Sequence, residues 1–132
     1  AANWQEALKN DRIKKVALAN PKLAPYGAAA QEALKKAQLW EPVQPKLVNA
    51  QDIAISFQYA STSAVDAGFC ALSVSVTPEG KVGCFFPIAQ APDIVQSACL
   101  LKRTTKRAAA EQFAAYLVSP AAQEIKAKFG YK

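Results

Sequence analysis

The clearest periodic pattern in the sequence lies between residues 28 and 38. Apolar side chains recur there at the spacing i, i+3, i+4, i+7, which is typical of a helix with one buried face: Ala30, Ala33, Leu34 and Ala37. Charged and amide side chains occupy the opposite face. The preceding segment, "NPKLAPYG" at residues 20–27, contains two prolines and is expected to be a rigid elbow leading into this helix.

The same reading predicts elements along the rest of the chain. Asn3 and Glu6 stand in a capping relation at the start of a short helix over residues 3–11. Ser119, Pro120 and Gly130 mark the start and end of a final helix. In order, the predicted elements are a helix at 3–11, a strand at 16–20, a helix at 28–38, a loop from 39 with a strand at 46–48, a helix at 51–61, strands at 65–76, 81–88 and 94–102, and helices at 105–118 and 120–129.

Strands and helices that alternate in the first half predict an α/β fold with a mainly parallel sheet flanked by helices. In such a sheet, helix N-termini gather at the carboxyl ends of the strands, where ligands usually bind. The elbow at residues 20–27 and the segment at residues 49–53 both take that position. Because the N-terminus of a helix attracts anions, two of them at one crevice favour anion binding rather than a reaction.

Composition narrows the possible functions. The 132 residues suffice for one domain, and 16 Lys and Arg against 10 Asp and Glu give a net charge of +6. The basic residues are scattered and no nucleic-acid-binding module appears, so we expect no nucleic-acid partner. No apolar run reaches the roughly 18 residues of a membrane span, and no signal-peptide pattern opens the chain. The chain is therefore expected to be either cytoplasmic or a mature or trimmed piece.

The reactive side chains give no support to catalysis. The sequence contains no histidine, which removes the commonest general base and metal ligand. Cys70, Cys84 and Cys99 form no CxxC pair, so no metal site is expected. Cys70 is expected to be a buried apolar residue, whereas Cys84 and Cys99 have the option of pairing in an oxidising compartment. We predict no catalytic residue and no enzymatic activity.

The two C-terminal helices carry apolar faces that the sheet does not need. These faces contain Ala109, Phe113, Tyr116 and Leu117 in the first helix, and Ile125 and Phe129 in the second. The sheet is already supplied with helices. The terminal pair is therefore expected to pack against something else.

Five segments together resemble the periplasmic molybdate-binding proteins of ABC transporters, which are type II periplasmic binding proteins. They are "VALANPKLAPYGAAAQEAL", "LWEPVQPKLV", "VDAGFCALS", "SACLLKR" and "YLVSPAAQEIKAKFGY", in that order along the chain. The resemblance covers the second, ligand-binding lobe of the family at residues 1–104 and its C-terminal helices at residues 105–132. It implies that these helices pack toward a first lobe whose opening strand and serine-bearing loops are absent from this sequence.

The resemblance also implies a set of ligand-binding residues. Members of the family hold a tetrahedral oxyanion, molybdate or tungstate, without a metal or another cofactor. The main-chain N–H groups of Tyr26 and Ile53 correspond to two of their contacts, and Pro25 and Gly27 hold the elbow beside Tyr26. Ala71 stands where some members add a tyrosine hydroxyl. Asp52 matches an acidic position, and its carboxylate repels the anion unless it turns away to cap its own helix.

As implied by the resemblance, the protein is the periplasmic substrate-binding component of an ABC transporter, with the membrane permease as a partner. The first lobe, or self-association, is then expected to cover the C-terminal helices. Two alternatives stay open on the sequence. The first is the effector-binding domain of a LysR-type transcriptional regulator, which shares the fold. The second is a cysteine hydrolase, which the absence of histidine disfavours.

Overall fold

The computed structural model describes residues 1–131, and it separates into two compact units. The first unit is Ala1–Ile94 and the second begins at Val95. The predicted boundary at residue 104, between a ligand-binding lobe and the C-terminal helices, concerns function and stays a prediction; residue 132 of that second segment lies outside the described residues. No helix within residues 1–131 is both long and apolar enough to cross a membrane.

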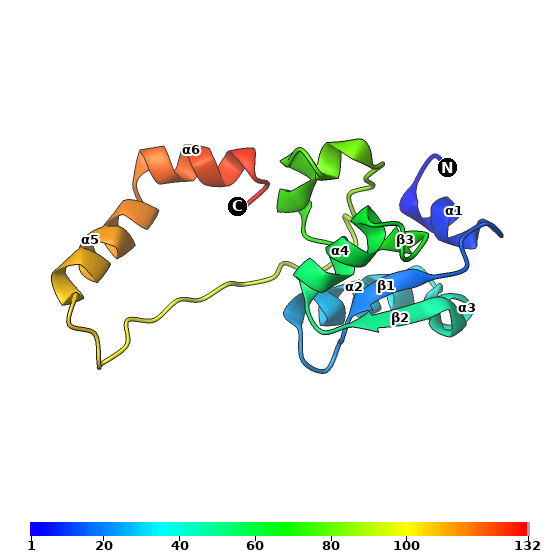
Figure 1. The fold of residues 1–132 in the computed structure, drawn as a ribbon, viewed down its shortest axis with the longest axis horizontal. Coiled ribbons are helices and arrows are strands. Elements are labelled where there is room, and N and C mark those ends of the chain that lie inside the picture. The colour runs from blue at the N-terminus through cyan, green and yellow to red at the C-terminus, as the bar shows by residue number, and fades with distance from the viewer. Residues whose placement is uncertain (132) are drawn as a thin grey trace. The chain divides into compact units, whose positions relative to one another are not determined.

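A parallel sheet of three strands organises the first unit (Figure 1). The strands are β1 (Val16–Ala19), β2 (Leu47–Ala50) and β3 (Ala67–Gly68), in the order β2-β1-β3. All four residues of β1 are buried, as the central position requires. The unit's helices are α1 (Trp4–Lys9), α2 (Pro25–Lys36), α3 (Trp40–Val43) and α4 (Ile53–Ser61). The predicted α/β class with a mainly parallel sheet is confirmed.

The core forms where α1, α2 and α3 supply apolar side chains to β1. Leu18 and Leu34 are fully buried, and Trp4 and Leu8 of α1 join them. The other members of this cluster are Val16, Ala30, Leu39, Val43 and Phe69. The apolar stripe predicted for α2 is therefore its buried face: Ala30, Ala33 and Leu34 are buried, and Ala37 packs against the cluster.

Several helix ends follow the predicted chemistry. Asn3 Oδ1 accepts a hydrogen bond of 2.9 Å from the Glu6 N–H at the start of α1. In the second unit, α5 spans Arg107–Leu117 and α6 spans Pro120–Lys128. Ser119 caps α6 by accepting from the Ala122 N–H, and Gly130 has a φ of 76° just past its end. Glycine reaches this left-handed conformation without the cost that a side chain brings.

The later predicted strands are wrong in the described residues. Of 65–76, only Ala67–Gly68 is a strand, and Leu72–Val76 is a 3-10 helix, η2. Segment 81–88 contains the end of another 3-10 helix, η3 (Gly80–Val82), and then irregular chain; segment 94–102 is irregular too. Phe86 and Ile88 pack against the core without a ladder partner, so burial alone explains their apolar character.

The chain on either side of the predicted helix at 28–38 also differs from expectation. The loop predicted from residue 39 contains α3 and a short 3-10 helix, η1 (Gln44–Lys46). α2 begins at Pro25 rather than at Ala28, because proline at the first helical position needs no N–H partner and already has a helical φ. The elbow's second proline is therefore the first residue of the helix.

Asp66 ties the start of β3 to the start of β1. Its Oδ2 accepts hydrogen bonds of 2.8 Å from the N–H groups of both Lys15 and Lys14, and these bonds lower the pKa of the Asp66 carboxyl. A lowered pKa in the folded state means that the unfolded state takes up the proton first as the pH falls. Asp66 therefore stabilises the fold above the carboxyl's ordinary pKa of about 3.9 and loses that effect as the pH falls through its lowered value.

We expect Asp66→Asn to reduce the free energy of unfolding at neutral pH and to have a diminishing effect as the medium is acidified below about pH 4. Thermal melts of both proteins across this pH range measure the difference. Asp11→Asn removes the same charge from another exposed site and serves as the matched control. If the difference in stability between Asp66→Asn and wild type stays constant with pH, the ionised Asp66 carboxylate does not stabilise the fold as proposed.

Candidate functional site

The carboxyl ends of β1 and β2 lie side by side. Ala19 pairs with Ala50 at the last register position, and the Asn20 N–H donates to the Ala50 carbonyl over 2.9 Å. α2 follows β1 through the elbow, and α4 follows β2 after two residues. Both helices therefore begin from the same edge of the sheet, which is the arrangement that the sequence predicted.

Hydrogen bonds within the elbow fix its course. Asn20 Oδ1 accepts from the Lys22 N–H over 3.0 Å, and the Asn20 carbonyl accepts from Leu23 and Ala24 over 3.1 and 2.9 Å. Asn20 thus turns the chain through its own side chain. This role was not predicted, although an asparagine that precedes a proline is a turn signal.

Tyr26 is the second residue of α2 and is half-buried. The N-cap position before the helix is Ala24, whose extended backbone (φ −119°, ψ 124°) carries no side chain able to cap the first turn. Pro25 at the first position fixes the direction in which the helix starts. The rigidity of the elbow itself stays a prediction.

Gly27 is buried against the end of β1. A Cβ atom at this position would lie 2.0 Å from the Ala19 carbonyl oxygen and 2.7 Å from its carbon, both of them backbone atoms. Atoms that are not bonded to one another do not approach this closely. Only glycine therefore lets the first turn of α2 lie this close to the strand. The sequence left two explanations for Gly27, a close backbone or a close ligand, and the structure supplies the close backbone.

The start of α4 places Asp52 and Ile53. Asp52 is the N-cap, and its Oδ1 accepts a hydrogen bond of 2.9 Å from the Ile55 N–H. The carboxylate therefore makes the capping contact that was considered for it. Ile53 is the first residue of α4 and is half-buried.

Ser56 anchors α4 to the chain that follows β3. Its side chain is fully buried, and its hydroxyl donates to the Phe69 carbonyl over 2.6 Å. Phe69 in turn donates its N–H to the Ala17 carbonyl of β1. Ala71, two residues later, is extended (φ −72°, ψ 144°) and half-buried just before η2. Its methyl group offers no hydrogen bond at the place where a tyrosine hydroxyl was considered.

A depression of about 480 Å³ lies beside the elbow, but Tyr26 and Ile53 take no part in it. It is lined by Asn20, Pro21, Lys22, Gln31, Trp40, Gln44, Leu47 and Asn49. These residues come from the elbow, α2, the α3–η1 segment and β2. The depression is therefore distinct from the surface at the two helix starts.

The cysteines do not form a reactive centre. All three are free, and Cys84 and Cys99 are exposed; their pairing in an oxidising compartment stays an open alternative. Cys70 is half-buried, and burial raises the pKa of its thiol to about 11. A thiol with so high a pKa stays protonated at neutral pH and is a poor nucleophile. Within residues 1–131, no group of three or more His, Cys, Asp or Glu side chains is placed to hold a metal ion.

Comparisons with known proteins agree on one family. The family described as "Bacterial extracellular solute-binding protein" matches residues 1–132. The molybdate-binding protein ModA of Rhodobacter capsulatus is 40% identical over 124 residues, covering 94% of this chain and 49% of that protein. ModA of Azotobacter vinelandii is 38% identical over 128 residues, covering 94% of this chain and 50% of its own length.

Solved structures give the same result. The Azotobacter vinelandii periplasmic molybdate-binding protein matches with a TM-score of 0.86 and 30% identity, covering 98% of this chain and 58% of that one. The substrate-binding domain of a Clostridium difficile molybdenum ABC transporter, itself described as putative, matches with a TM-score of 0.65 and 25% identity over 98% of this chain and 57% of its own.

This chain therefore spans about half the length of the relatives that it matches. These relatives are named as binding proteins, and they give no support to the alternative of a LysR-type regulator. A family match along the whole sequence, a confirmed α/β lobe and two helix starts at one sheet edge point the same way. The chain belongs to the bacterial extracellular solute-binding protein family.

Proposed function

We propose that this chain is the second lobe of a periplasmic binding protein that delivers molybdate or tungstate to an ABC transporter. The observation that carries the proposal is the structural match to the Azotobacter vinelandii molybdate-binding protein, with its TM-score of 0.86. The identity of 40% to the Rhodobacter capsulatus protein supports it. The membrane permease is the expected partner, the periplasm the expected location, and no catalytic activity is expected.

The proposed ligand contacts are the main-chain N–H groups of Tyr26 and Ile53. These residues occupy the first turns of α2 and α4, which start from the same sheet edge. Partial positive charge at a helix start favours an anion, and a main-chain donor needs no titratable side chain. Pro25 and Gly27 hold the first turn of α2 in place, and Ala71 adds only a methyl group.

Asp52 bears on this proposal because it carries a negative charge next to Ile53. One of its oxygens accepts from Ile55, so the carboxylate is directed to its own helix. The cap uses the N–H of Ile55, which is a different group from the Ile53 N–H proposed for the ligand. We therefore propose that Asp52 sets the rigidity of the α4 start and leaves the Ile53 N–H to the ligand.

The C-terminal helices have an apolar surface available to a further partner. Phe113 and Tyr116 of α5 are 61% and 45% exposed, and Ile125 of α6 is 49% exposed. Exposed apolar area of this kind is usually covered by association. The proposed cover is the first lobe of the same binding protein or, without it, a second copy of this chain.

The contact at Tyr26 is tested by removing its N–H. In a two-lobed protein that carries this lobe, Tyr26→Pro is expected to weaken molybdate binding by about 1.5–3 kcal/mol, the scale of one hydrogen bond to a charged group. Calorimetric titration measures this loss. Tyr26→Phe keeps the N–H and is the matched control, with little change expected.

A second proline also disfavours the helical conformation of Pro25, which begins α2. Thermal melts of both variants therefore accompany the titration and show whether the helix start is kept. If a folded Tyr26→Pro protein binds molybdate with unchanged affinity, the Tyr26 N–H does not contact the ligand.

A further inference from the structure

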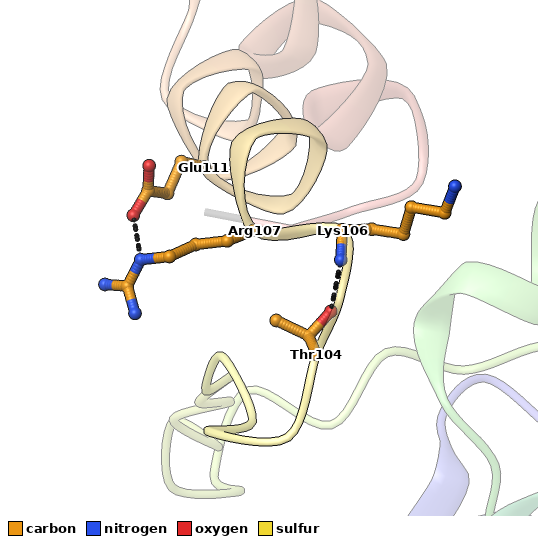
Figure 2. Close-up of polar contacts among 4 residues, drawn as sticks. All are labelled: Thr104, Lys106, Arg107 and Glu111. Carbon is orange, nitrogen blue, oxygen red and sulfur yellow. Dashed lines mark hydrogen bonds and ion pairs between the residues drawn. The ribbon is translucent and has the colours of Figure 1, made fainter.

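Four exposed cations precede and open α5, and we call Lys102, Arg103, Lys106 and Arg107 the basic cluster. The sequence has no acidic residue between Asp93 and Glu111, so the cluster lies in a long stretch without negative charge. Arg107 Nε is 2.8 Å from Glu111 Oε1. Figure 2 shows this pair joined by a dashed line, with the Lys106 side chain extending away from it. Glu111 therefore neutralises one member of the cluster and leaves strong positive charge at the surface.

Helix stability does not account for these positions. The partial charge at a helix N-terminus is positive, so cations there are unfavourable and belong in the last turn. The other basic helix ends obey this rule, with Lys9 in α1, Lys35 and Lys36 in α2, and Lys126 and Lys128 in α6. α5 breaks it: Lys106 is its N-cap, Arg107 is its first residue, and its first turn contains no acid.

The ion pair between Arg107 and Glu111 also has the less stabilising order of its two residues along the helix. Arg107 precedes Glu111 by four residues, whereas a pair with the acid first complements the helix dipole better. Both groups are more than half exposed, and an exposed pair contributes little to stability. The cluster therefore weakens the start of α5, which is expected of charges kept for binding.

We propose that the basic cluster binds the anionic headgroups of a membrane surface. Clusters of about four or more Lys and Arg attract acidic lipids, because each cation adds to the attraction within the screening length. Leu100 and Leu101 directly precede the cluster and are 39% and 52% exposed, so they offer apolar contact beneath the headgroups. This inference does not depend on the proposed oxyanion site, which lies in the other unit.

A lipid surface fits the cluster better than a nucleic acid does. Residues 95–104 are irregular chain, and lipid headgroups rearrange around such a segment without a fixed register. Proteins that bind single-stranded nucleic acid place aromatic side chains beside the cations, where bases stack on them, and residues 95–112 contain no aromatic residue. The cluster is accompanied by aliphatic side chains and alanines instead.

The test is sedimentation of the 132-residue chain with vesicles of phosphatidylglycerol and phosphatidylcholine in equal parts, and with vesicles of phosphatidylcholine alone. We expect binding to the first that falls with added salt, and far less binding to the second. The variant Lys102→Gln/Arg103→Gln/Lys106→Gln/Arg107→Gln is expected to bind the anionic vesicles at least about tenfold more weakly.

The matched control is Lys9→Gln/Lys14→Gln/Lys81→Gln/Lys128→Gln, which removes four exposed cations elsewhere. Both variants lower the net charge from +6 to +2, so a difference between them reports the cluster and not the total charge. The control is expected to stay within about threefold of wild type. Circular dichroism melts establish that each variant is folded.

The proposal is overturned by no binding of the wild-type chain to anionic vesicles, by equal binding to both kinds of vesicle, or by an equal loss in the two variants. Binding of the cluster to an RNA or an acidic protein but not to anionic vesicles overturns it as well. In a two-lobed protein that carries this lobe, molybdate affinity is expected to be the same with the cluster variant as with the wild-type sequence. Failure of the oxyanion proposal is therefore seen separately.

Discussion

Replacing Gly27 by alanine is expected to lower the free energy of unfolding by about 3 kcal/mol, the upper end of what overpacking costs. The new Cβ atom would lie 2.0 Å from the Ala19 carbonyl oxygen, and backbone at the end of a buried strand cannot turn aside as a flexible side chain does. α2 must then shift away from β1. A loss of this size is a large part of the roughly 5–15 kcal/mol that holds a small domain together.

Thermal and denaturant unfolding measure this effect. Gly83→Ala is the matched control, because the nearest atom to its new Cβ is 3.7 Å away, an ordinary contact. That variant is expected to unfold like wild type or to gain slightly from a less flexible unfolded chain. If Gly27→Ala melts at the wild-type temperature, the close approach of α2 to β1 is wrong. If it is destabilised, oxyanion binding is expected to weaken as well, because Tyr26 moves with the helix start.

The chain by itself is expected to bind molybdate at least about a thousandfold more weakly than a two-lobed relative does, because three lost hydrogen bonds to a charged ligand suffice for that factor. The proposed donors, at Tyr26 and Ile53, come from one side of the ligand. A closed cleft adds donors from its second side and excludes water. With one side only, the ion keeps much of its hydration and gains little by binding.

The measurement is calorimetry on this chain and on the Rhodobacter capsulatus protein in parallel. An amide-shift titration of the chain locates the weak binding, with the Tyr26 and Ile53 signals expected to move and the signal of buried Leu34 serving as the control. Light scattering reports whether the exposed faces of α5 and α6 cause association. Submicromolar binding by a monomer of this chain rules out the argument that a second wall is needed.

The sequence predicted best those parts of the fold that depend on local chemistry. The apolar period of α2, the cap at Asn3 and the Ser119–Pro120 start of α6 all appear in the structure. Each of these signals is formed by residues that are only a few positions apart in the sequence. Each acts through a local hydrogen bond or through burial of one helix face. Their outcome hardly depends on distant parts of the chain.

The strands after β3 were predicted wrongly because a strand is defined by its neighbour. An apolar run such as "KVGCFFPI" is compatible with a strand, but it forms one only if an open edge lies alongside it. Here Phe86 and Ile88 partly bury their apolar side chains against the core cluster, and Pro87 has no N–H to donate to a neighbouring strand. Val95 is 86% exposed and all of residues 95–102 are exposed, so this segment gains no burial that would hold it as a strand.

The candidate site also has features that the sequence predicted and features that it did not. Alternation of strands and helices predicted that the elbow and the start of α4 share one sheet edge, and the register of Ala19 with Ala50 agrees. The choice of Tyr26 and Ile53 came from the family resemblance, since every helix start offers main-chain N–H groups. The roles of Asn20 and Gly27 in fixing the elbow depend on distances in the folded backbone, which the sequence does not determine.

The central position of β1 also determines when during folding this site comes into existence. Val16 pairs with Leu47 on one side and with Ala67 on the other, so each half of the sheet closes only after a long helical connection has been made. Contacts between residues so distant in sequence slow folding, because the entropy of closing the loop is lost before pairing stabilises the product. A nascent chain that has formed α2 but not β2 holds one helix start without the other. An oxyanion that binds at the proposed site is therefore unable to guide early folding, because that site exists only once β2 has paired with β1.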